Sequence, residues 1–171
     1  MTAAPLTVYK LTVLYMLNRL KEPIAKERIS AFLLENGYAN FASLLQTYAE
    51  LEQQGLVRTE STRDKDFLIL TDAGKESLFY FRKELSADIM AQADAYLKEK
   101  GLELLNERYL SAEYDRAPSG DYLVRLSVRE KDLPIIDLTL SLPNLEAAEA
   151  ACRAWKEKNQ EIYASVIEKL F

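Results

Sequence analysis

The chain has 171 residues and a formal net charge of −5, and its 49% hydrophobic and 29% charged residues are typical of a globular protein. It contains no histidine and a single cysteine, Cys152, which excludes histidine-dependent catalysis, histidine-ligated metals and an internal disulfide. Gly-rich phosphate-binding motifs, a signal peptide and any apolar run near the ~20 residues that cross a bilayer are also missing from the sequence. We therefore expect a cytoplasmic protein that is not an enzyme, with no catalytic residues, no metal, no cofactor and no membrane partner.

The first 71 residues have the pattern of a winged helix-turn-helix. Apolar residues recur at helical spacing over residues 6–20 and 26–36, and a third helix is predicted over residues 40–54 with Asn40 as its N-cap. On this third helix the residues expected to face inward are Leu44, Leu45, Tyr48 and Leu51. A polar stretch between two apolar ones predicts a hairpin, the wing, near residues 56–70. Three helices followed by a hairpin is the order of a winged helix, whose third helix usually enters the major groove of DNA.

The charges of this region leave two functions open. Residues 1–71 hold eight Lys or Arg and eight Asp or Glu, and the third helix has no Lys or Arg, whereas DNA-binding domains are usually basic on one face. If the protein binds DNA, base contacts are expected from Ser43, Gln46 and Thr47 on the outward face of the third helix. Phosphate contacts are then expected from Lys26, Arg28, Arg58, Arg63 and Lys65. The alternative is a winged-helix scaffold that binds protein or only packs.

A long connecting helix is predicted over residues 72–99, with Thr71 as its N-cap. Its apolar stripe consists of Leu78, Leu85, Ile89, Ala93 and Tyr96. The aromatic residues Phe79, Tyr80 and Phe81 are consecutive, so they point in different directions around the helix and one stripe cannot bury them all. An exposed aromatic needs cover, and we expect these three residues at the interface of a homodimer.

After residue 101 the apolar residues alternate with period two, which predicts a three-stranded antiparallel meander near residues 104–142. Turns are expected at residues 117–120 and 131–134, and a last helix over residues 144–170 should cover the apolar face of the sheet. The outer face of the sheet shows Arg125, Arg129, Asp137 and Thr139. A ligand site is conceivable there, but a solvated face with cross-strand ion pairs is favoured.

The predicted fold class is thus α+β, in three parts. Residues 1–71 form the winged helix-turn-helix, residues 72–100 the connecting and dimerisation helix, and residues 101–171 the small sheet with its C-terminal helix.

Four segments of the chain resemble a bacterial family known as domain of unknown function 4364. They are Pro5–Leu20, Glu35–Val57, Leu70–Leu78 and Cys152–Leu170. The segment LTDAGKESL at Leu70–Leu78 is also similar to the wing-to-helix junction of PadR-like and MarR-like repressors. The resemblance implies a cytoplasmic winged-helix protein of the transcriptional-regulator kind, without catalytic residues or a known ligand. PadR-like repressors dimerise through the helix that follows the wing, which here corresponds to Asp72–Lys98.

These observations give two expectations of function. The first is a homodimeric transcriptional regulator that binds double-stranded DNA, with no effector that the sequence can name. The second is a non-catalytic interaction module that uses the winged-helix scaffold for assembly without binding DNA.

Overall fold

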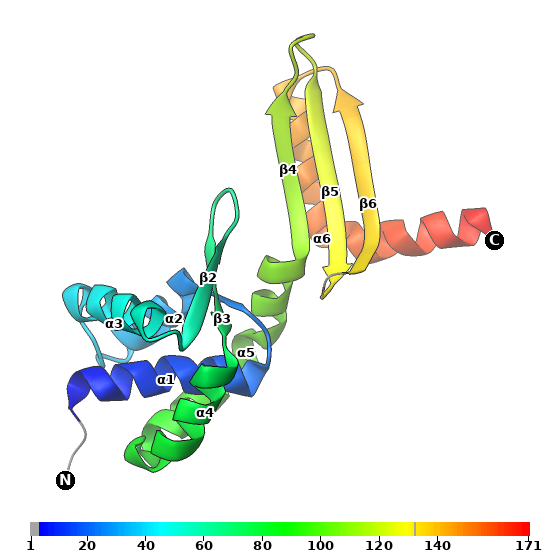
Figure 1. The fold of residues 1–171 in the computed structure, drawn as a ribbon. Coiled ribbons are helices and arrows are strands. Elements are labelled where there is room, and N and C mark those ends of the chain that lie inside the picture. The colour runs from blue at the N-terminus through cyan, green and yellow to red at the C-terminus, as the bar shows by residue number, and fades with distance from the viewer. Residues whose placement is uncertain (1–3, 132) are drawn as a thin grey trace. The chain divides into compact units, whose positions relative to one another are not determined.

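The computed structural model describes residues 4–131 and 133–171, and the chain divides into two compact units, Met1–Arg108 and Tyr109–Phe171 (Figure 1). Both units combine helices with a three-stranded antiparallel sheet, so the mixed α+β class predicted from the sequence is confirmed. The unit boundary follows Arg108, whereas the sequence placed a boundary after residue 100. Asp132, which belongs to the turn expected at residues 131–134, lies outside the described residues.

The first unit consists of helices and a small three-stranded sheet. Its elements in chain order are α1 (Pro5–Leu20), β1 (Ile24–Ala25), α2 (Lys26–Glu35), α3 (Phe41–Gln53), β2 (Val57–Ser61), β3 (Asp66–Leu70), α4 (Asp72–Phe81), a 3₁₀ turn (Arg82–Glu84) and α5 (Ala87–Tyr109). The β2–β3 hairpin confirms the one predicted near residues 56–70. Strand β1 was not predicted; it has only two residues, both buried, and it pairs with β3 to give the sheet order β1-β3-β2.

Helix α1 lies at the centre of the first unit. All residues from Leu11 to Leu17 are buried, because α1 contacts α3, α4 and β3 on different sides. A helix that is covered all round belongs to the interior of its unit and not to its surface. Thr12, the polar residue within this stretch, is accommodated because its hydroxyl donates a hydrogen bond to the carbonyl oxygen of Val8 at 2.7 Å.

The single connecting helix predicted over residues 72–99 is wrong. Helix α4 ends at Phe81, and Leu85 turns into the core with an extended backbone, φ −92° and ψ 127°. The next helix starts anew because the hydroxyl of Ser86 accepts a hydrogen bond from the backbone N–H of Ile89 at 3.2 Å, which caps α5. The buried Leu85 and the cap at Ser86 thus break the helix at a place where the apolar stripe alone suggested continuity.

Helix α5 also continues beyond residue 99, where the predicted helix ended, through the buried Gly101 to Tyr109. The period-two pattern therefore begins at Leu110, later than the expected start near residue 104.

The second unit confirms the predicted meander and its covering helix. Its elements are β4 (Leu110–Arg116), β5 (Tyr122–Glu130), β6 (Leu133–Leu142) and α6 (Leu145–Leu170), with sheet order β4-β5-β6. The inner face of the sheet packs against one stripe of α6, whose buried residues are Ala148, Cys152 and Trp155. Trp155 is fully buried, and its indole N–H donates a hydrogen bond to the carbonyl oxygen of Ser127 at 3.3 Å. Burial also raises the pKa of the Cys152 thiol, so this cysteine behaves as a small apolar residue of the core.

Candidate nucleic-acid interface

The start of α3 is fixed by a reciprocal cap. The side chain of Asn40 accepts a hydrogen bond from the backbone N–H of Ser43 at 2.8 Å, and the hydroxyl of Ser43 accepts one from the backbone N–H of Asn40 at 3.0 Å. The same hydroxyl donates to the carbonyl oxygen of Asn40 at 2.9 Å. Ser43, a predicted base contact, is therefore half-exposed and already engaged in holding the first turn of the helix.

The inward and outward faces of α3 differ from the prediction at two positions. Thr47 was expected to face DNA, but it is fully buried, and its hydroxyl donates to the carbonyl oxygen of Ser43 at 2.7 Å. Leu45 was expected to face inward, but it is 57% exposed. Both errors have one cause: Leu44, Thr47, Tyr48 and Leu51 follow the 3-4 spacing of the buried stripe, and Leu45 does not.

The outward face of α3 is consequently more apolar than the sequence suggested. Phe41 is 69% exposed, and Ala42 and Ala49 are exposed beside it and Leu45. Gln46, the third predicted base contact, is exposed as expected, and its amide donates a hydrogen bond to Glu50 Oε1 at 3.3 Å. The 3-4 spacing of the buried stripe excludes Leu45, so spacing alone predicts Leu45 as a surface residue.

Ion pairs within the first unit engage three of the five predicted phosphate contacts. The guanidinium of Arg28 lies 2.8 Å from Glu107 Oε1, and the ammonium of Lys65 lies 3.0 Å from the same oxygen. The hydrogen bond to Glu107 raises the pKa of Arg28. Lys26 lies 4.0 Å from Glu52 and stacks over the ring of Tyr48 at 5.2 Å. Their charges therefore stabilise contacts among α2, α3, α5 and the hairpin.

The other two predicted phosphate contacts, Arg58 on β2 and Arg63 in the hairpin turn, are exposed. On α1, Lys10 forms a 2.5 Å ion pair with Glu50, and the hydrogen bond from Lys10 lowers the pKa of that carboxyl. A second acid on α3, Glu52, accepts a hydrogen bond from Thr59 of β2. The surface beside α3 thus presents two exposed arginines on the hairpin and a helix without cations.

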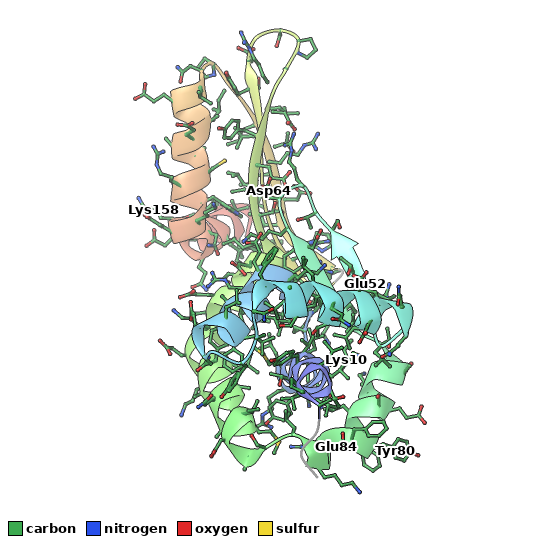
Figure 2. The ribbon with its side chains drawn as sticks, turned by 90° about the vertical axis from the view of Figure 1, so that its left-hand side faces the viewer. Lys10, Glu52, Asp64, Tyr80, Glu84 and Lys158 are labelled. Atoms are coloured by element: carbon green, nitrogen blue, oxygen red, sulfur yellow. The ribbon has the colours of Figure 1, made fainter. Side chains whose placement is uncertain are left out.

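A groove of about 760 Å³ opens between α2, α3 and the tip of the hairpin, where Figure 2 labels Asp64. Its apolar wall consists of Leu34, Phe41, Leu44, Leu45, Tyr48 and Ala49. Its polar wall carries charges of both signs, including Lys26, Glu52, Arg63, Asp64 and Lys65. Burial raises the pKa of Tyr48 to about 12, and the hydroxyl of Tyr48 lies 2.7 Å from that of Ser30. The groove therefore combines an apolar wall with a rim of mixed charge.

The three aromatics expected at a dimer interface lie on α4. Phe79, Tyr80 and Phe81 are all exposed, while their neighbour Leu78 is buried in the core. The rings of Phe79 and Tyr80 meet edge to face at 5.7 Å, and Figure 2 shows Tyr80 pointing away from the first unit.

Within residues 4–131 and 133–171, no cluster of three or more Cys, Asp or Glu residues is arranged to hold a metal ion. Over the same residues, every helix is too short or too polar to span a lipid bilayer.

Comparison with known proteins places the chain in a family. The family model described as Domain of unknown function (DUF4364) matches residues 9–170, so the chain belongs to this family, and the resemblance drawn from the sequence is confirmed. No curated protein and no solved structure matches the chain. The family's description assigns no activity, so function has to be argued from the surface of α3 and the hairpin.

Proposed function

We propose that this protein is a winged-helix transcriptional regulator that binds double-stranded DNA and catalyses no reaction. The observation that carries this proposal is the order α1, β1, α2, α3, β2, β3 with sheet order β1-β3-β2, which is the order of a winged helix. In helix-turn-helix proteins the helix at the place of α3 enters the major groove, and side chains of neighbouring elements contact the phosphates. The exposed face of α3 next to the β2–β3 hairpin suits that role.

The chemistry of α3 favours an A·T-rich target. Guanine is usually read by Arg or Lys, and α3 has neither. Gln46 can form paired hydrogen bonds with adenine, and the apolar side chains of Phe41 and Leu45 can contact thymine methyl groups. Since Arg58 and Arg63 are exposed on the hairpin beside α3, phosphate contacts would come mainly from these two residues. Affinity should then depend on salt as expected for about one to two phosphate contacts per copy.

The proposed regulator acts in the cytoplasm. It acts as a homodimer, because two copies read two half-sites about 34 Å apart on DNA. The exposed Phe79, Tyr80 and Phe81 of α4 are the proposed contact between copies in the first unit. Their edges and faces supply apolar area that a monomer leaves in water.

The second candidate is a protein-interaction module, and the groove beside α3 is the observation that favours it. Phe41 and Leu45 expose large apolar surfaces along a groove whose apolar wall includes Leu34. Such a groove suits an apolar peptide segment better than a phosphate backbone.

Selection from random duplex DNA, followed by fluorescence-anisotropy titration at low and moderate salt, tests the first proposal. We expect A·T-rich fragments to be selected. Gln46→Ala should weaken the preferred fragment by about 1–3 kcal/mol and leave random DNA unchanged, while Arg63→Ala should weaken all DNA alike. Gln92→Ala on α5 and Arg153→Ala on α6, both at exposed positions, are the matched controls. If no fragment binds better than random DNA at low salt, the protein is not this regulator.

Leu45→Lys separates the two candidates. If α3 faces the duplex, a cation at this position strengthens binding to random DNA and steepens its salt dependence, while the preference for A·T-rich fragments falls with the thymine contact of Leu45. If the groove binds an apolar peptide segment instead, the same cation weakens the binding of that segment, because the ammonium has to be desolvated in the groove.

A further inference from the structure

The inner face of the second unit's sheet is only partly covered. Helix α6 packs over β4 and β5, where Val124 and Leu126 are buried. On β6 the inward side chains Ile136 and Leu138 are only half-buried, and Leu140 is 40% exposed. One helix is narrower than three strands, so an apolar margin remains along β6.

The last three turns of α6 form a second uncovered surface. The amide of Asn159 donates hydrogen bonds to the carbonyl oxygens of Trp155 at 3.1 Å and Lys156 at 3.3 Å, and side chains that bond to the helix backbone in this way often accompany bends. Residues 160–170, here called the arm, turn away from the sheet and extend past β6 (Figure 1). Figure 2 shows the arm on the helix side of the sheet. The arm continues the apolar stripe of α6 through Ile162, Tyr163, Val166, Ile167 and Leu170.

The two edges of the sheet differ in charge. Strand β4 has three charged residues, Glu113, Asp115 and Arg116, whereas the longer β6 has one, Asp137. Charged side chains on an edge strand oppose pairing with another chain, and a long apolar edge invites it because its outer N–H and C=O groups are unpaired. Pro134 has no backbone N–H and opposes pairing at the start of β6, so the edge that is suited to pairing is β6 over residues 135–142, the same edge past which the arm extends.

We infer that the second unit self-associates about a two-fold axis, with β6 of two copies paired antiparallel and each arm lying over the inner face of the other copy's β6. Pairing extends the sheet to six strands, so that each arm finds a sheet beneath it. Each copy thus supplies the cover that the other copy's apolar margin needs.

The charge pattern of β6 selects a register for this pairing. Opposed residues must share a face, so Asp137 could oppose itself, which places two carboxylates side by side and is unfavourable. Shifting the axis to Leu138 sets Asp137 opposite Thr139 of the second copy. Arg125 on β5 pairs with Thr139 and is exposed on the same outer face. The carboxylate of Asp137 in one copy therefore comes near the guanidinium of Arg125 in the other copy, and this happens twice per dimer.

Apolar area for this contact comes from the inner face of β6 and from the arm. The exposed fractions of four large apolar residues there together amount to nearly two whole side chains. These residues are Leu140, Tyr163, Ile167 and Leu170. At about 200 Å² for a large side chain this is ~380 Å² per copy and ~750 Å² in the dimer, before half-buried side chains and backbone pairing are counted. An area of this size, with the paired backbone added, fits an association at micromolar concentration.

Sedimentation velocity of the full chain between about 1 and 100 μM tests the inference. We expect the wild type to dimerise, and we expect Thr139→Asp, which adds a carboxylate opposite Asp137, and Ile167→Asp in the arm each to raise the dimer dissociation constant at least about tenfold. Ser111→Asp on the outer face of β4 should leave the dissociation constant unchanged. Phe79→Ser on α4 should leave this association intact, which separates it from contacts of the first unit.

Leu138→Cys provides a readout that does not depend on a disruptive charge. With the axis at Leu138 the two cysteines oppose each other at a Cα separation of about 4.5–5.5 Å, within the range of a disulfide, so mild oxidation should give a crosslinked dimer. Ser111→Cys on the opposite edge should give none. A wild type that stays monomeric at 100 μM, or Thr139→Asp and Ile167→Asp variants that dimerise like the wild type, would overturn the inference.

Discussion

Gly74 offers the sharpest test of the packing in the first unit, because it lies where the first turn of α4 passes the residue that leads into β2. A Cβ atom at this position would lie 2.2 Å from the carbonyl oxygen of Leu56 and 2.7 Å from Leu70 Cδ1. The Leu70 side chain can rotate, but the Leu56 oxygen is held by the backbone N–H of Thr71 at 3.2 Å. The hydroxyl of Thr71 in turn accepts from Gly74 N at 3.0 Å and donates to the carbonyl oxygen of Gly55 at 2.6 Å. The clash therefore cannot be relieved without loosening the junction of hairpin and helix.

Gly74→Ala should lower the free energy of unfolding despite the better helix propensity of alanine. The propensity gain is at most about 1 kcal/mol, whereas overpacking against a fixed backbone atom costs ~1–3 kcal/mol or more. We expect a net loss of about 1–2 kcal/mol, which corresponds to a fall in Tm of roughly 2–8 °C for a chain of this size.

Urea unfolding followed by far-UV circular dichroism measures this difference, and Gly101→Ala is the matched control. A Cβ atom at Gly101 would meet only Leu20 Cδ1 at 3.8 Å, an ordinary contact in the middle of α5. Gly101→Ala should therefore stabilise the protein by about 0.5–1 kcal/mol. A Gly74→Ala variant as stable as the wild type, or a Gly101→Ala variant that loses as much, would refute the reasoning.

Two further predictions concern ionisable groups of the first unit. Glu107→Gln should lower the free energy of unfolding by about 1–3 kcal/mol, because Glu107 accepts charged hydrogen bonds from both Arg28 and Lys65. Glu99→Gln, an exposed change on the same helix, is the control and should cost almost nothing. Equal losses of the two variants in urea unfolding would contradict this prediction. The pKa of Tyr48 is about 12 in the folded protein against an ordinary value of 10.0, so its contribution to stability is intact below pH 10 and declines as the pH rises from 10 to 12. Between pH 10 and 12 the free energy of unfolding should therefore fall less in Tyr48→Phe than in the wild type, by on the order of 1–2 kcal/mol. If the free energy of unfolding falls equally with pH in the two proteins, Tyr48 ionises as readily in the folded state as in the unfolded state.

The order of the elements could be read from the sequence because periodicity is a local property. The change from helical to alternating spacing and back identified the meander and the covering helix α6, and a polar stretch between two apolar ones identified the hairpin. The outward face of α3 was misread at Thr47 and Leu45, where residue type was allowed to outweigh spacing. The break at Leu85 was missed because residues seven positions apart share a face in one continuous helix, and the cap at Ser86 carries the contrary signal.

Other features could not have been predicted from local pattern at all. Strand β1 has two residues and no measurable period, and it exists because β3 offers Ile24 and Ala25 a partner. Arg28 and Lys65 both pair with Glu107, which lies far from them in the chain. Because this pairing arises only from tertiary packing, a local pattern could not show that the two cations are already engaged.

The two proposals are linked by the small number of exposed cations beside α3. A single copy with about one to two phosphate contacts gains little electrostatic affinity, and low charge on α3 leaves base contacts to supply most of the binding energy. Joining two copies makes the second half-site an intramolecular partner at millimolar effective concentration, which raises affinity without any new contact. Under the proposed function, DNA binding at cellular salt therefore requires self-association. The edge of β6, with Asp137 as its one charged residue, and the apolar arm of α6 are the parts of the second unit that suit this role.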